Sequence, residues 1–90
     1  MANSVGTRPM ILDTVTASPL LFNWIYITAI EFEGYSLNTD NATVNDAAGH
    51  EIIRFSGKSD LSPVHVTGID RVQGIYLTVI TSGRVVVYVK

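Results

Sequence analysis

The chain has 90 residues, enough for one domain, and a domain of this size buries only about 60% of its unfolded surface. Hydrophobic residues make up 47% of the chain and charged residues 16%, which excludes intrinsic disorder and suggests that part of the surface is covered by other molecules. The net charge is −2 and the six basic residues are spread thinly along the sequence, so the basic stripe of a nucleic-acid-binding protein is absent.

Residues 1–9 are small and polar and lack the apolar segment of a signal peptide, so we do not expect secretion by that route. We expect these residues to form a flexible N-terminal arm, with docking on a neighbouring subunit as the alternative. Residues 10–90 then form a single β domain. Its first segment, "MILDTVTAS", is rich in β-branched residues and is followed by a proline, which predicts a strand over residues 10–17.

The segment "LLFNWIYITAIEFEG" predicts a long strand over residues 20–33, because its consecutive aromatic and β-branched residues disfavour a helix. It is too short to cross a membrane as a helix, and we expect no membrane partner. Every second residue forms an aromatic row of Phe22, Trp24 and Tyr26. The row can be core, a protein interface or a sugar-stacking platform. A buried row would favour a structural protein, and an exposed row beside polar groups would favour a binding module.

The segment from residue 35 to residue 73 predicts a hairpin followed by a less regular stretch. The hairpin arms are residues 42–44 and 51–55, joined by a turn in which Gly49 can adopt a positive φ. A short strand at Val64 and Val66 is predicted to end at Gly68. His50 and His65 have no further ligands at zinc-binding spacing, and the loop at residues 40–46 lacks the calcium pattern of an EF-hand. We therefore expect no metal and no cofactor.

The last segment, "GIYLTVITSGRVVVYVK", predicts a two-residue hairpin turn at Ser82-Gly83. In that register the paired residues on one face are Ile80 with Val85, Thr78 with Val87, and Tyr76 with Val89. Both faces of this hairpin are mostly apolar, whereas a sheet face in water alternates with polar residues. A domain this small can bury one face in its own core, and the other must lie under loops such as residues 58–73 or against a second chain. We expect the hairpin to contribute to contacts with a second chain. The candidate interface residues are Trp24, Tyr26, Tyr76, Val87 and Val89.

The whole pattern predicts an all-β fold: a small antiparallel β-sandwich or flattened barrel of about six to eight strands without substantial helix. No nucleophile motif, phosphate-binding loop or dinucleotide fingerprint is present. Glu31 and Glu33 share a strand face, but we interpret them as solvated charges and not as a glycosidase pair. We expect no catalytic residues and no enzyme activity.

The ending "GIYLTVITSGRVVVYVK", preceded by "ATVNDAAGHEIIRF" and by the early strand "LDTVTAS", resembles small all-β structural proteins of tailed bacteriophages. The likeness covers most of residues 10–90 and departs at "GKSDLSPVHVTGIDR". It implies a virion component made in the host cytoplasm: a capsid decoration protein, or alternatively a tail or baseplate element. The expected partners are further copies of the chain, with a trimer favoured, and other virion proteins such as a major capsid protein. A small carbohydrate- or ligand-binding β-module is the alternative function.

Overall fold

The structure is a computed structural model that describes residues 3–6 and 8–90. These residues form no helix and six β-strands: β1 (Met10–Leu12), β2 (Leu21–Glu33), β3 (Asn41–Asn45), β4 (Glu51–Ser56), β5 (Val64–Ile80) and β6 (Arg84–Val89). The strands lie in the order β1-β6-β2-β5-β3-β4, and all neighbours are antiparallel. The predicted small all-β fold is therefore confirmed.

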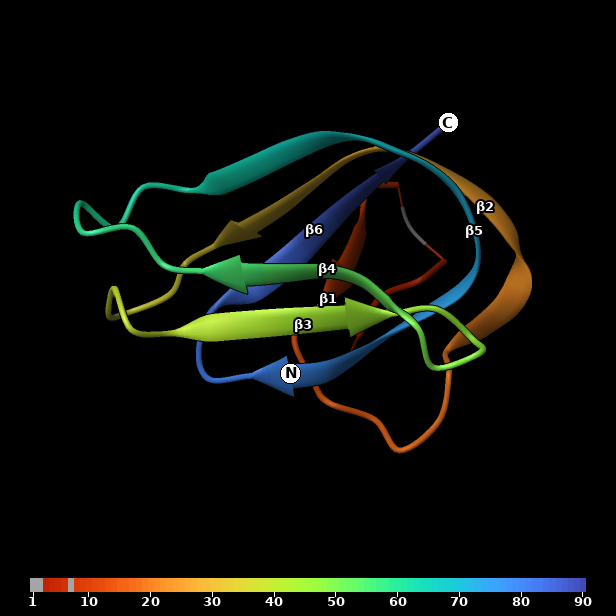
Figure 1. The fold of residues 1–90 in the computed structure, drawn as a ribbon, viewed down its shortest axis with the longest axis horizontal. Coiled ribbons are helices and arrows are strands. Elements are labelled where there is room, and N and C mark those ends of the chain that lie inside the picture. Colours follow the sequence, from red (N-terminus) through yellow and green to blue (C-terminus); the bar gives the residue numbers. More distant parts are fainter. Residues whose placement is uncertain (1–2, 7) are drawn as a thin grey trace.

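The long strands β2 and β5 form a curved ribbon that joins two layers. β2 runs beside residues 64–75 of β5. The end of β5 instead pairs with β3, and the second half of β2 pairs with β6. Figure 1 shows the ribbon curving round one end of the molecule, with β3 and β4 on one side and β1 and β6 on the other. The result is a flattened sandwich closed at one end by the ribbon.

The side chains of β2 change face at Thr28. The register of β2 slips at this residue against both neighbouring strands, which marks a β-bulge. The Thr28 hydroxyl donates a hydrogen bond of 3.1 Å to the main-chain oxygen of Tyr88. Because side chains alternate with a period of two, one extra residue moves all later side chains to the opposite face. Phe32 is therefore buried although it shares its parity with the exposed Trp24.

The core lies between the two layers and is centred on three aromatic rings. The centroid of Phe32 lies 4.7 Å from that of Tyr35 and 5.7 Å from that of Phe55. The Tyr35 hydroxyl donates a hydrogen bond to the main-chain oxygen of Ser62 and accepts one from the N–H of Lys58, so it fastens the loop after β4 to the core. Buried aliphatic side chains of the other strands complete the core: Leu12, Ile27, Ile30, Val44, Ile75, Leu77, Val85 and Val87.

The predicted C-terminal hairpin is wrong. β5 ends beside β3, whereas β6 lies between β1 and β2, so the residues around Ser82 cross from one layer to the other. Gly83 has a φ of 78°, and a Cβ there would lie 2.5 Å from the main-chain oxygen of Glu33. Asp40 holds the crossing by accepting hydrogen bonds from the Ser82 hydroxyl and the N–H of Leu37. A hairpin and a layer crossing share the local signal of a positive-φ glycine, and only the partner strands distinguish them.

Most of the apolar surface in residues 74–90 is covered within the chain. The inward side chains of β5 and β6 come from opposite layers and meet in one core. Val86, on the outer side of β6, is only 5% exposed because it pairs with Ile11 of β1 and Glu31 of β2. Val79 and Tyr88 remain exposed. The premise that this stretch leaves a whole apolar face uncovered is therefore wrong, and self-association has to rest on another surface.

Four other predicted elements can be compared with the structure. The first strand ends at Leu12, because the side chain of Asn3 accepts hydrogen bonds from the next two main-chain N–H groups. Gly68, at a φ of 81°, does not end a strand but lies within β5. The central hairpin is confirmed as β3 and β4. In the predicted N-terminal arm, Ser4 forms a β-bridge with Ile11; residues 1, 2 and 7 of the arm lie outside the described residues, and its flexibility stays a prediction.

Candidate functional site

The outer face of the β2–β5 ribbon carries an exposed aromatic row. We call Phe22, Trp24 and Tyr26 the aromatic strip; their side chains are 65%, 59% and 43% exposed. They precede the bulge at Thr28 and therefore point away from the core. The interpretation of this row as hydrophobic core is wrong, because the bulge separates it from the buried second half of β2.

Two cations lie over the rings of the strip. The guanidinium carbon of Arg71 is 5.4 Å from the ring centroid of Trp24, and the Nζ of Lys90 is 5.2 Å from that of Tyr26. Arg71 reaches the strip because it pairs with Tyr26 across the ribbon. Cation–π contacts at exposed sites contribute about 0.5–1 kcal/mol each. They orient both rings while leaving much of their surface open to solvent.

Positive charge gathers around the strip. Arg54 and Arg84 form ion pairs with carboxylates, at 2.8 Å and 2.7 Å. Among the described residues, no Asp or Glu oxygen lies within ion-pair distance of Arg8, Arg71 or Lys90. Arg8 donates a 3.2 Å hydrogen bond to the backbone oxygen of Lys90, and Lys90 and Arg71 lie over successive rings of the strip. The site is thus a local positive region on a chain whose net charge is negative.

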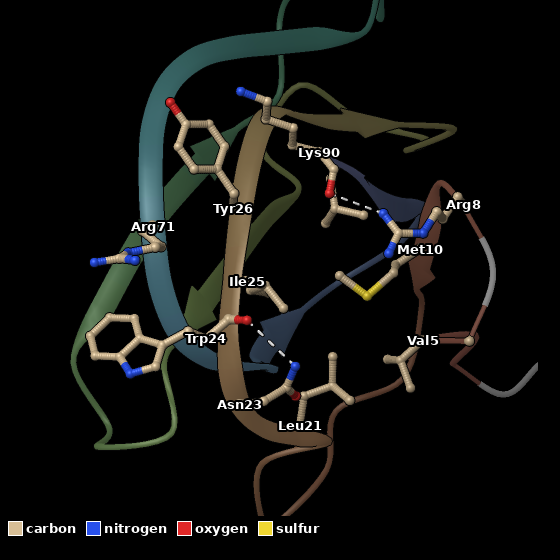
Figure 2. Close-up of a pocket in the computed structure, with 12 residues that line it drawn as sticks. Val5, Arg8, Met10, Leu21, Asn23, Trp24, Ile25, Tyr26, Arg71 and Lys90 are labelled. Carbon is tan, nitrogen blue, oxygen red and sulfur yellow. Dashed lines mark hydrogen bonds between the residues drawn. The ribbon is translucent and has the colours of Figure 1, made fainter.

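A pocket of about 580 Å³ opens beside the first half of β2. Figure 2 shows Ile25 and Leu21 of β2 on one side of it and Met10, Val5 and Arg8 on the other. The three cations of the site also line it, and its described lining contains no Asp or Glu side chain. The pocket therefore combines apolar walls with three cationic side chains that have no Asp or Glu ion-pair partner among the described residues.

The predicted interface residues separate into two groups. Trp24 and Tyr26 are exposed in the strip, and the half-buried Val89 lines the neighbouring pocket. Tyr76 is half-buried and pairs with β3 in the other layer, away from the strip, and Val87 is fully buried in the core. The structure thus brings three of the five together and leaves Val87 with no surface to offer a partner.

The cations of the site were missed from the sequence. Arg8, Arg71 and Lys90 come from three distant segments, and no spacing connects them with the strip. The register of Tyr26 with Arg71 depends on the slip that follows it between β2 and β5, where β5 carries the extra residue. The one available signal is the two-residue alternation of Phe22, Trp24 and Tyr26, which marks the row but not its neighbours.

The remaining polar groups serve local structure. Glu33 pairs with Arg84, and Glu31 accepts a 3.5 Å hydrogen bond from Tyr88, so the two glutamates have separate partners. The pKa of Asp40 lies below its ordinary value, chiefly because the Ser82 hydroxyl donates to it. Among the residues that the structure describes, no three His, Asp or Glu side chains gather closely enough to hold a metal ion.

Comparisons of the chain with protein-family models, curated proteins and solved structures give no match. The part of the chain that the structure covers contains no helix long and apolar enough to cross a membrane.

Proposed function

We propose that this protein is a non-enzymatic structural component of a bacteriophage virion that packs its aromatic strip against another protein. The observation that carries the proposal is the exposure of Trp24 and Tyr26 beside Arg71. Trp, Tyr and Arg are the residue types most enriched at the energetic centres of protein interfaces. The virion assignment comes from the sequence resemblance, which favours a capsid decoration or stabilising protein over a tail or baseplate element.

The partners that we propose are further copies of the chain, with a trimer favoured, and a major capsid protein. Covering the strip would remove roughly 300 Å² of aromatic surface from water, worth about 7 kcal/mol at 25 cal/mol per Å². Association costs about 4–15 kcal/mol in lost freedom of motion. The strip therefore supports association only together with the surface around it, consistent with the roughly 800 Å² that each partner buries in a specific interface.

Light scattering after size-exclusion chromatography tests the self-association. We expect an oligomer at tens of micromolar that Trp24→Ser converts to a folded monomer. The matched control is Leu37→Ser, since Leu37 is 61% exposed, slightly more than Trp24 at 59%, but lies outside the strip. A wild-type monomer at this concentration would contradict self-association, and an oligomer that both variants leave intact would contradict the role of the strip.

A carbohydrate-binding module is the second candidate function, and one observation favours it. From the sequence, we assigned an exposed row beside polar groups to this module, and the strip is exposed beside Asn23, Gln73 and Arg71. Trp24 and Tyr26 also line the neighbouring pocket. The protein interface stays first because Trp, Tyr and Arg together are the residue types most enriched at the centres of protein interfaces. Calorimetric titration with two hexasaccharides, one of β-1,4-linked glucose and one of β-1,4-linked N-acetylglucosamine, distinguishes the protein interface from the carbohydrate-binding module. Binding that Trp24→Ser abolishes would reverse the order of the candidates.

A further inference from the structure

The first half of β2 has no strand partner on one edge among the residues that the structure describes, and we call this its free edge. β6 pairs with β2 only over residues 27–33, and the last main-chain hydrogen bond runs from the N–H of Lys90 to the oxygen of Tyr26, at 2.9 Å. Beyond it, the side-chain amide of Asn23 donates at 3.4 Å to the main-chain oxygen of Trp24 (Figure 2). Because alternate residues of a strand direct their main-chain groups to the same edge, Trp24 and Tyr26 both face this side. A side-chain amide thus takes the place of a strand partner at Trp24.

The pocket described above lies along this free edge. Leu21 and Ile25 of β2 lie on one side of it and Met10 and Val5 on the other (Figure 2), and Val89 is also part of its lining. A strand added to an edge lies about 4.8 Å from its neighbour and directs alternate side chains to opposite faces. One set of side chains of an added strand would therefore enter the apolar pocket, while the other set would face its rim.

The cations at the rim of the pocket indicate which residue types the other set of side chains of an added strand would carry. Arg8, Arg71 and Lys90 line the pocket, and none of them has an Asp or Glu partner within ion-pair distance in the described part of the chain. Acidic side chains on an added strand would complement these cations. Three cations on a chain of net charge −2 are few for a nucleic-acid backbone, and a free main-chain edge matches a peptide main chain.

We propose that this edge binds an extended peptide of a partner protein in which apolar and acidic residues alternate. The peptide lies beside the first half of β2, on the edge that β6 covers along the second half, and its main chain pairs with Trp24. Its apolar side chains enter the pocket, and its carboxylates contact the cations. This is strand addition, in which main-chain hydrogen bonds provide affinity and alternate side chains provide specificity. The site goes beyond the function proposed above, because it uses the edge of β2 and not the outer face of the strip.

The probe is the acetylated and amidated hexapeptide Val-Glu-Val-Glu-Val-Glu, titrated into the 15N-labelled protein and followed by NMR. We expect saturable shifts at the amides of Trp24, Tyr26 and Lys90. Lys90→Gln and Arg71→Gln should each weaken binding by about two- to fivefold, the size of a surface ion pair. Lys58→Gln is the control, since Lys58 lies outside the pocket and also lacks an ion pair.

Two comparisons test the main-chain pairing. N-methylation of alternate peptide residues should abolish binding, because it removes donors without changing the charge. Trp24→Pro and Trp24→Ser both remove the indole, but only the proline removes the edge N–H, and proline is tolerated at such edges. We expect Trp24→Ser to bind the peptide more tightly than Trp24→Pro even where both abolish self-association, which separates main-chain pairing at the edge from the role of the strip.

Several results would overturn the proposal. These are no binding at millimolar peptide, equal binding of the Val-Lys hexapeptide, and equal binding of the N-methylated peptide. Shifts at the same amides with an oligothymidylate and none with the acidic peptide would assign the site to single-stranded nucleic acid instead.

Discussion

Phe22 and Phe32 offer a direct test of the bulge in β2, because they are the same residue type at the same parity of one strand. Phe32 is fully buried and stacks on Tyr35 and Phe55, whereas Phe22 is 65% exposed. Truncating a buried Phe to Ala costs about 3–5 kcal/mol in lost burial and cavity formation. A surface substitution changes the free energy of unfolding by about 0.5 kcal/mol or less. We therefore expect Phe32→Ala to destabilise the protein by at least about 2.5 kcal/mol more than Phe22→Ala.

Urea unfolding of both variants, followed by circular dichroism, measures this difference. A domain of this size has a total stability of about 5–13 kcal/mol, so Phe32→Ala retains a measurable transition only in the upper part of that range. Phe32→Leu, with an expected loss of about 1–1.5 kcal/mol, is the graded substitute. The series is run at several protein concentrations, because covering of Phe22 in an oligomer would add a concentration-dependent loss. Equal losses at Phe22 and Phe32 in the dilute monomer would refute the change of face at Thr28.

Three further predictions concern residues that hold the layers together. Gly83→Ala should cost more than about 1–2 kcal/mol, because a Cβ would meet main-chain atoms there, whereas Gly49→Ala meets nothing within 4 Å and should cost only the positive-φ penalty in chemical denaturation. Tyr35→Phe should lose about 1–3 kcal/mol and speed hydrogen exchange in the loop after β4, since it leaves a main-chain N–H without its acceptor. The pKa of Asp40 is lowered in the folded state, chiefly by the Ser82 hydroxyl. Its stabilisation is therefore present above the unfolded value of about 3.9 and is lost as the pH falls through the lower folded value. Asp40→Asn should reduce the melting temperature at neutral pH and flatten its fall below about pH 4.

The sequence was sufficient for the kind of fold and for most strands, since β-branched and aromatic runs favour strands wherever they occur. It was not sufficient for the pairing of those strands. The Ser82-Gly83 pair carries a hairpin signal, yet the flanking strands pair with β2 and β3, which lie far away in the chain. The residues of the turn do not determine whether its flanking strands pair with each other, because this pairing depends on which distant strands cover their edges.

The faces of the strands were predicted only where the alternation is unbroken. In β2 the bulge at Thr28 inverts the pattern, and in β5 a second slip at Thr78 places Leu77 and Ile80 on the same face. A bulge needs one extra residue and no particular residue type, so a uniform period of two gives the wrong face after it. For this reason the aromatic row could be found from the sequence, but neither its exposure nor its cationic neighbours could be.

The most direct test of the account uses the intrinsic fluorescence of Trp24, the one tryptophan in the chain. Acrylamide quenching is measured in a dilution series, with light scattering on the same samples. We expect Trp24 to be quenched in the dilute native monomer nearly as strongly as in the unfolded chain, and to become protected at the concentrations where the scattering mass rises. A native monomer whose tryptophan resists quenching, or an oligomer in which it stays fully accessible, would contradict the claim that the aromatic strip is an open contact surface.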